Sequence, residues 1–255
     1  MSRLALTSCQ FFVVWIGWLV AGSTAAMASS PLPPYTATTS CTSGSLGVVD
    51  GSAPCSQANG DGSDNDTFTV SPFAGVSANS SVAGNPEDGF GSFGTLDYSF
   101  ELVGGNPGDQ VPLLIFTDLF TSIGGDAYAF SEIVVSTGST GLGSVVACQS
   151  YGGTCPPSAS ANFSGSFGLI VSSGALEDLH LEVEATSNPV LGAATSSATA
   201  DPLIEINPGF SNAGNYSIEL SPGVGNGVAP IPEPGTLILV CIAPLLFLAR
   251  RCFSR

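Results

Sequence analysis

The sequence predicts an all-β protein, an antiparallel β-sandwich of jelly-roll type that lies between an N-terminal signal helix and a short C-terminal transmembrane helix. Three observations carry this prediction. Apolar and polar residues alternate with period two in several segments, Gly, Pro, Asn and Ser residues separate these segments, and one apolar run stands near each end of the 255-residue chain. Outside the two ends, no segment has a helical period over three turns.

The N-terminal end has the features of a secretory signal peptide. Arg3 precedes the apolar run 11–20, and small residues then lead to an A-x-A cleavage pattern formed by Ala26 and Ala28. We therefore expect residues 1–28 to be removed during export.

The strands are expected where the period-two pattern is clearest. In 95–102, apolar side chains at even positions alternate with polar ones, and the pattern returns in 179–185 and 216–220. Further strands are expected at 67–70, 111–116, 127–135, 144–148, 163–171 and 203–206. Strands with one polar face and no crossover helices must bury their apolar faces against one another, which favours a sandwich. A β-helix is the alternative, but no fixed-period repeat supports it.

The charge of the chain is divided unevenly. The basic side chains lie in the two end segments, at Arg3, Arg250, Arg251 and Arg255. The 20 Asp and Glu residues all fall between Asp50 and Glu233. Because this acidic passenger has no Lys or Arg, it repels phosphate, which disfavours nucleic acid, nucleotide and anionic lipid partners. Cations, neutral sugars and neutral surfaces are compatible with the charge, which also keeps an exported protein soluble.

Three ordered elements form the C-terminal end: the tripeptide Pro232, Glu233 and Pro234, an apolar helix predicted over 235–249, and the pair Arg250 and Arg251. At ~1.5 Å per residue this helix reaches roughly 22 Å, short of the ~30 Å hydrocarbon core of a bilayer. It therefore suits transient holding in a membrane better than permanent anchoring. The arginine pair is expected on the cytoplasmic side, which leaves the passenger outside.

This layout resembles the PEP-CTERM sorting signal, and the resemblance covers about a tenth of the chain, at its C-terminal end. It implies export in a Gram-negative, polysaccharide-producing bacterium and processing by an exosortase, an integral-membrane cysteine-type transpeptidase. The protein would be held briefly at the inner membrane and then reach the cell surface or the extracellular space. The same tail is also associated with some ice-binding proteins.

We therefore divide the chain into a signal peptide (1–28), one acidic β-sandwich passenger (29–222), a Gly/Pro spacer (223–231) and the sorting tail (232–255). The segment 201–226 resembles the passenger end of many PEP-CTERM proteins. We expect it to form the closing hairpin of the sandwich.

Four cysteines lie in the passenger: Cys41, Cys55, Cys148 and Cys155. Export leads to an oxidising compartment, where thiols tend to pair. Four cysteines allow three connectivities. Proximity favours Cys41 with Cys55 and Cys148 with Cys155, because both pairs close short loops that contain turn residues.

Residues 59–66 concentrate side-chain oxygens, and Asp61, Asp64 and Asp66 are candidate Ca²⁺ ligands. Their spacing does not fit an EF-hand, and Asn-Gly-Asp-Gly is ordinary turn chemistry. We expect a solvated, flexible loop before the strand 67–70 and no bound cofactor.

Other constellations give weak catalytic signals. His180 is the only histidine, and alternation places it on a polar face beside Glu182, as expected of a surface histidine. Glu182 and Glu184 share that face, but such neighbours are too common to name a glycosidase pair. Residues 89–94 match G-x-G-x-x-G, yet they lead into a strand, so we expect a glycine-rich turn.

The sequence as a whole indicates an exported structural protein of the cell surface or the extracellular polysaccharide matrix, without catalysis. The alternatives are a calcium- or carbohydrate-binding module and a glycoside hydrolase. The expected partners are the exosortase, the membrane before processing, and extracellular polysaccharide.

Overall fold

The structure, a computed structural model, describes residues 31–43, 47–59, 61–83 and 89–226. Within these residues the chain forms thirteen β-strands and two short 3-10 helices, η1 (Pro189–Leu191) and η2 (Ala213–Asn215). The strands are β1 (Thr36–Ser43), β2 (Gly47–Gly51), β3 (Cys55–Asn59), β4 (Gly62–Thr69), β5 (Gly75–Val82), β6 (Phe90–Gly104), β7 (Gln110–Gly124), β8 (Ala127–Thr137), β9 (Thr140–Ser150), β10 (Asn162–Ser172), β11 (Leu176–Ser187), β12 (Ala194–Ile206) and β13 (Tyr216–Leu220).

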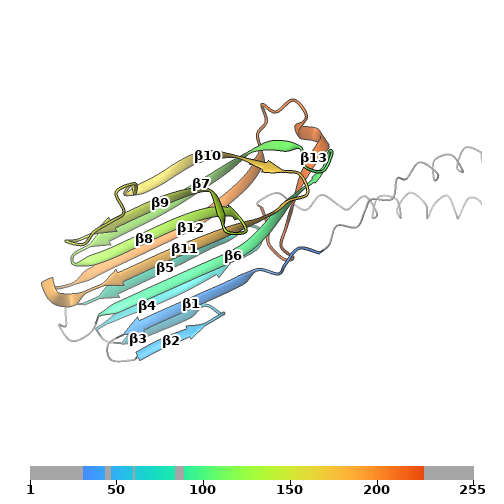
Figure 1. The fold of residues 1–255 in the computed structure, drawn as a ribbon. Coiled ribbons are helices and arrows are strands. Elements are labelled where there is room, and N and C mark those ends of the chain that lie inside the picture. Colours follow the sequence, from blue (N-terminus) through green and yellow to red (C-terminus); the bar gives the residue numbers. More distant parts are fainter. Residues whose placement is uncertain (1–30, 44–46, 60, 84–88, 227–255) are drawn as a thin grey trace, which may run out of the picture. The chain divides into compact units, whose positions relative to one another are not determined.

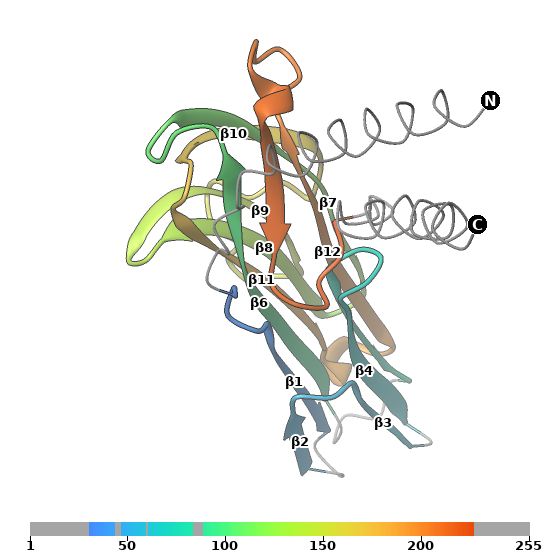
Figure 2. The same ribbon diagram turned by 90° about the vertical axis from the view of Figure 1, so that its right-hand side faces the viewer.

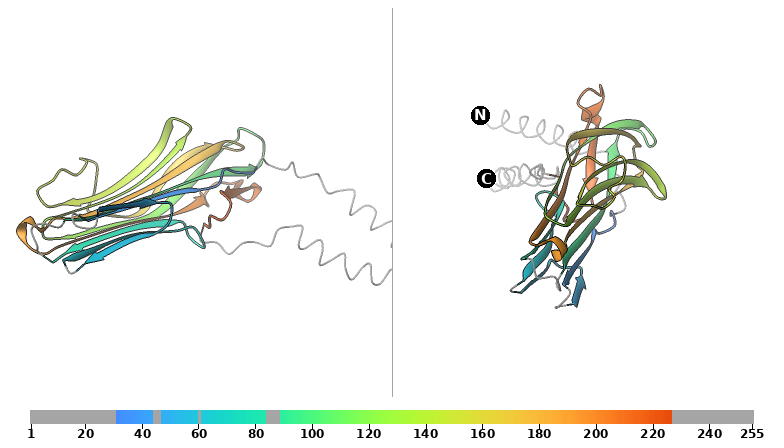
Figure 3. Two further views of the ribbon diagram at one scale, coloured as in Figure 1. Left: turned by 90° about the horizontal axis from the view of Figure 1, so that it is seen from below. Right: turned by 90° about the vertical axis from the view of Figure 1, so that its left-hand side faces the viewer.

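These strands form two sheets that lie face to face (Figure 1, Figure 2). The seven-stranded sheet has the order β2-β1-β6-β11-β8-β9, and β13 pairs with β6. The six-stranded sheet has the order β10-β7-β12-β5-β4-β3, and Figure 3 gives two further views of the layers. The pairings between neighbouring strands are antiparallel. The predicted all-β fold with two antiparallel sheets is therefore confirmed for the described residues.

The pleat of the strands decides which side chains form the core. Leu96 and Phe100 of β6, Leu181 of β11 and Ile133 of β8 point inward from the seven-stranded sheet, and Ile115 of β7 points inward from the other sheet; all are fully buried. Full burial of a side chain of this size contributes about 1.5–3 kcal/mol. The contact between the two inner faces therefore holds the sandwich together.

The expected closing hairpin at 201–226 is wrong. β12 lies between β7 and β5 in the six-stranded sheet, whereas β13 pairs with the end of β6 in the seven-stranded sheet. β1 pairs with β6 only as far as Asp97, and β13 continues along β6 from Phe100. Alternation is a property of one strand, but the choice of partner depends on the order of strands in the sheet, which alternation does not encode.

Several strands were not expected from the sequence because their inward residues are small or polar. This holds for β1, β3, β5 and the first half of β12, where residues such as Thr39, Ser80 and Ser196 are buried. Such strands lack a continuous apolar face, so their sequences do not show a clear alternation of apolar and polar residues. Buried hydroxyls there bond across the sandwich: Ser80 Oγ donates to the Phe90 carbonyl at 2.8 Å. The short strand β2 was not expected either, and its residues 48–51 are exposed.

The folded domain also extends beyond the expected boundary at residue 222. The Gly225 N–H donates to the Val70 carbonyl at 2.5 Å. The Asn226 side chain accepts from the Ile204 N–H at 2.8 Å and donates to the Ile204 carbonyl at 2.6 Å. Residues 223–226, which we expected in the spacer, are therefore attached to the sandwich.

The two disulfides match the pairing that sequence proximity predicts. Cys41 of β1 pairs with Cys55 of β3, so this bond links the two sheets, with a Cα–Cα distance of 6.0 Å. Cys148 of β9 pairs with Cys155 at 5.7 Å. The loop that follows Cys155 lies along β9, where the Cys148 N–H donates to the Ser160 carbonyl at 2.8 Å.

We expect removal of the inter-sheet disulfide to destabilise the domain clearly. The variant Cys41→Ala/Cys55→Ala should lower the free energy of unfolding by about 3 kcal/mol, because a closed loop of this length restricts the unfolded chain by roughly that amount. Denaturant unfolding of the exported protein measures the change. A peptide map under non-reducing conditions that joins Cys41 to Cys148 would contradict the assignment.

Candidate functional site

The sorting and processing residues lie outside the described part of the chain. These are Ala26 and Ala28 of the signal, Pro232, Glu233 and Pro234 of the tripeptide, and Arg250 and Arg251 after the apolar helix expected at 235–249. Their roles stay predictions. Among the described residues, no helix is long and apolar enough to cross a membrane.

The expected flexible acid loop is wrong for most of its length. Asp61 lies in the turn before β4, but Asp64 and Asp66 belong to β4 itself and point between the two sheets. Their exposed fractions are 1% and 0%. A run of Gly, Asn and Asp is usually turn chemistry, and here the sheet partners β3 and β5 override that preference.

The two buried carboxylates differ in their surroundings. Asp64 Oδ1 accepts from the Gln57 N–H at 3.0 Å, and burial still raises the pKa of Asp64. Neither oxygen of Asp66 has a hydrogen-bond partner of good geometry among the described residues. Burial raises the pKa of Asp66 to about 7, and the backbone N–H of Thr67 opposes this rise only in part. The folded protein therefore holds Asp66 largely protonated below neutral pH.

Residues 89–94 are not the turn that we expected. β6 begins at Phe90, and its glycines serve packing: Gly94 faces Asp66, and a side chain at Gly94 would collide with the Asp66 carboxylate. No group of three or more His, Cys, Asp or Glu side chains that could hold a metal ion is found among the described residues. Asp61, Asp64 and Asp66 thus do not gather into such a group.

A second group of carboxylates lies on the outer face of the seven-stranded sheet. We call it the acidic face and define it as Asp97 of β6, Glu132 of β8, and His180, Glu182 and Glu184 of β11. These residues occupy the partly exposed positions of their strands, which alternate with buried ones. Strand pairing brings them together, because His180 is directly opposite Asp97, and Glu182 is directly opposite Glu132.

His180 is the cation of this face. Its Nδ1 lies 2.6 Å from Asp97 Oδ1, and its Nε2 lies 3.4 Å from Glu182 Oε2. Hydrogen bonds to Asp97 and then to Glu182 raise the pKa of His180 to about 10, although partial burial opposes the rise. The imidazole is therefore protonated at neutral pH and is held between two carboxylates. The expected surface histidine beside Glu182 is confirmed, and Asp97 is a partner that sequence reasoning missed.

The Glu182 carboxylate repels the two remaining carboxylates of the face, Glu132 and Glu184. Burial raises the pKa of Glu132, and the charge of Glu182 across the strand pair raises it further, while the charge of His180 opposes the rise. Burial also raises the pKa of Glu184, with a smaller contribution from Glu182. Like charges directly opposite each other on paired strands are destabilising. Repulsion between these carboxylates is therefore unfavourable in the folded protein, and a positively charged ligand on this face would reduce it.

Three aromatic side chains share this outer face. Phe93 of β6 and Phe130 of β8 are the direct strand partners of Glu184 on its two sides. Tyr128 lies two residues from Phe130, and the two rings are stacked, with centroids 6.5 Å apart and planes 7° apart. Neither Phe93, Tyr128 nor Phe130 belongs to the core between the sheets. The rings are therefore available to a ligand on the surface.

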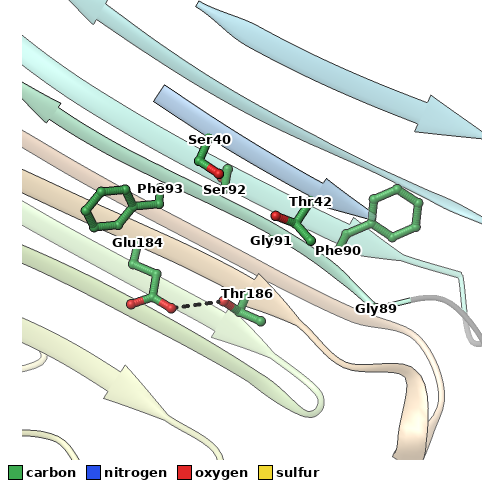
Figure 4. A pocket seen from close by; sticks show the side chains of 9 residues that line it. All are labelled: Ser40, Thr42, Gly89, Phe90, Gly91, Ser92, Phe93, Glu184 and Thr186. Carbon is green, nitrogen blue, oxygen red and sulfur yellow. Dashed lines mark hydrogen bonds between the residues drawn. The ribbon is translucent and has the colours of Figure 1, made fainter. Parts of the chain in front are cut away.

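A hollow of about 300 Å³ adjoins Glu184 on the same face (Figure 4). The Thr186 hydroxyl donates to Glu184 Oε1 at 3.3 Å, and the Phe93 side chain lies beside Glu184. The lining is small and polar apart from the two phenylalanines: Ser40, Thr42, Gly89, Phe90, Gly91, Ser92, Phe93, Glu184 and Thr186. Phe90 and Ser92 are buried and point into the sandwich, so they line the hollow through their backbone. The outward groups are the hydroxyls of Ser40, Thr42 and Thr186, the Phe93 ring and the Glu184 carboxylate, and they can exchange hydrogen bonds and apolar contact with a ligand.

Comparison with known proteins adds no assignment, since neither a family model nor a curated protein matches the chain. The candidate site therefore rests on its geometry.

The buried Asp66 predicts an unusual pH dependence of stability. Its pKa is higher in the folded state than the ordinary 3.8, so the unfolded state loses its proton first, and stability should fall as pH rises from about 4 to about 7. The loss attributable to Asp66 is at most on the order of 4 kcal/mol. Asp66→Asn should remove this part of the pH dependence, while the exposed control Asp50→Asn should not.

Thermal unfolding of the exported domain between pH 4 and pH 8 tests this expectation. If the stability of the native protein and that of Asp66→Asn change with pH in the same way over this range, Asp66 is ionised in the folded state. Calcium and magnesium are added separately at pH 8, and a calcium-specific rise in melting temperature that Asp66→Asn abolishes would show a bound ion in place of the proton.

Proposed function

We propose that the chain is an exported, non-catalytic structural protein of the cell surface or extracellular polysaccharide matrix, and that it binds glycan through the acidic face. The observation that carries the glycan-binding part is the row of strand partners Phe93, Glu184 and Phe130 beside the hollow lined by hydroxyl groups. Binding sites of this kind combine apolar and aromatic walls with a few polar groups that fix orientation.

Several features support export and sorting. The signal peptide and the Pro232-Glu233-Pro234 tail are sequence features, and the two disulfides are typical of proteins in oxidising compartments. The jelly-roll connectivity and the two terminal helices belong to this proposal as well. In it, an exosortase recognises the tail and releases the passenger to the cell surface.

The chemistry of the face suits sugars. Aromatic rings present a flat apolar surface to the C–H face of a sugar, and ionised carboxylates accept strong hydrogen bonds from hydroxyl groups. The strands that carry these side chains are paired along most of their length, so the rings and carboxylates have fixed spacing. The negative charge of the passenger disfavours acidic polysaccharides and leaves neutral or positively charged ones.

A glycoside hydrolase is the second candidate. It is favoured by Glu184, whose pKa is raised by burial, next to Glu182 on the same strand face. Two carboxyl groups in unlike environments are the usual acid and base of such enzymes. Release of reducing ends from a bound polysaccharide, lost in Glu184→Gln, would favour this function over simple binding.

The sorting part of the proposal predicts the C-terminus of the mature protein. Mass spectrometry of the exported protein should find chains that end near Glu233, because the apolar helix is short for a permanent span. An intact Arg255 on most exported molecules would contradict processing.

The glycan-binding part predicts a loss of binding when the rings are removed. The variant Phe93→Ala/Phe130→Ala should bind a retained polysaccharide about tenfold more weakly or worse, which corresponds to about 1.4 kcal/mol. Pull-down with a panel of insoluble and immobilised polysaccharides measures the change. Phe116→Ala/Phe120→Ala is the matched control, because both rings are exposed on the opposite sheet. Equal loss in both variants would contradict a site on the acidic face.

A further inference from the structure

Glu184 lies in a row that has an aromatic side chain on each side. Its direct partner on β6 is Phe93, and its direct partner on β8 is Phe130. Directly opposite residues of antiparallel strands have Cβ atoms roughly 5 Å apart. Both rings are therefore within reach of a group that contacts the Glu184 carboxylate. The row thus places one negative charge between two aromatic side chains.

The described part of the protein offers no Lys or Arg side chain to this carboxylate. Residues 29–233 contain no Lys or Arg. The imidazolium of His180 is the nearest cationic group in the described part, and both of its ring nitrogens are already engaged by Asp97 and Glu182. The described partner of Glu184 is the neutral Thr186 hydroxyl. Partial burial of an ionised carboxylate without a counter-charge is unfavourable, as the raised pKa of Glu184 reflects.

We propose that the row of Phe93, Glu184 and Phe130 binds the ammonium group of an amino sugar in a glycan chain. An ammonium group within about 6 Å of an aromatic face gains a cation–π attraction, and it also donates charge-assisted hydrogen bonds to a carboxylate. Neutral sugars and N-acetylated sugars lack this charge. The inference rests on the proposed glycan-binding function and names the class of glycan.

The surroundings of the row favour a sugar over the lysine side chain of a peptide. The hollow beside Glu184 is lined by the hydroxyl groups of Ser40, Thr42 and Thr186, which can exchange hydrogen bonds with sugar hydroxyls. The stacked rings of Tyr128 and Phe130 extend the apolar surface along β8. A sugar ring presents hydroxyls and an apolar C–H face at once, whereas a lysine stem presents only methylene groups.

The test uses the exported protein and titration calorimetry with three tetrasaccharides of glucosamine, N-acetylglucosamine and glucose, and with tetralysine. The native protein should bind the glucosamine tetramer at least about tenfold more tightly than the other two sugars, and more tightly than tetralysine. Glu184→Gln should weaken binding of the glucosamine tetramer more than it weakens binding of the two uncharged tetramers, so that the preference for the glucosamine tetramer is lost. Phe93→Leu and Phe130→Leu, which keep an apolar side chain but remove the ring, should reduce the same preference.

Asp118→Asn is the matched control, because it removes one carboxylate between the exposed rings of Phe116 and Phe120 on the six-stranded sheet. It should leave all affinities unchanged. An equal loss in Asp118→Asn and Glu184→Gln would show attraction by net charge alone, and stronger binding of tetralysine would show a peptide site; either result overturns the inference. If all three sugars bind the native protein equally, the ammonium site is wrong and glycan binding stands. If none binds, glycan binding fails too.

Discussion

The whole passenger folds without a lysine or an arginine, and this constraint governs where its carboxylates can lie. A carboxylate that leaves water needs a proton, a hydrogen-bonded partner or a cation. In the middle of β11 the strand pleat resolves the problem, since Leu179, Leu181 and Val183 point into the core and Glu182 points outward. Near the start of the strand, Glu177 is buried, and its carboxylate accepts a hydrogen bond from the Thr137 hydroxyl. Burial of apolar side chains therefore holds the two sheets together, and most of the carboxylates lie at the surface.

Besides Glu177, two places depart from that division, and each uses a different solution. Between the sheets, Asp66 is buried against Gly94 without a good partner, so its pKa rises to about 7 and a proton balances it. On the acidic face, His180 provides the balancing charge for Asp97 and Glu182. The pKa values of Glu132 and Glu184 are raised, although the charge of His180 lowers that of Glu132 in part. No cationic group of the described residues has a comparable effect on Glu184.

Strands with a strong alternation of apolar and polar residues could be predicted from the sequence. Strands whose inward residues are small or polar could not. The segments 95–102 and 179–185 lie in β6 and β11 as expected, because each carries a continuous apolar face. β5 was not predicted because the small residues Ala78 and Ser80 interrupt its apolar inner face between the valines at 76 and 82. Asp64 and Asp66 were expected in a solvated loop because the adjacent Gly, Asn and Asp residues are typical of turns. Their burial results instead from the pairing of β4 with β3 and β5, which the local sequence does not reveal.

The candidate site shows the same division between local and long-range information. His180 and Glu182 are two residues apart, so period two places them together. Asp97 is 83 residues from His180, and only the pairing of β6 with β11 makes them neighbours. The row of Phe93, Glu184 and Phe130 likewise needs three strands in one register. Asn226, the last described residue, is bonded to Ile204 of β12 in the six-stranded sheet, whereas the acidic face lies on the seven-stranded sheet.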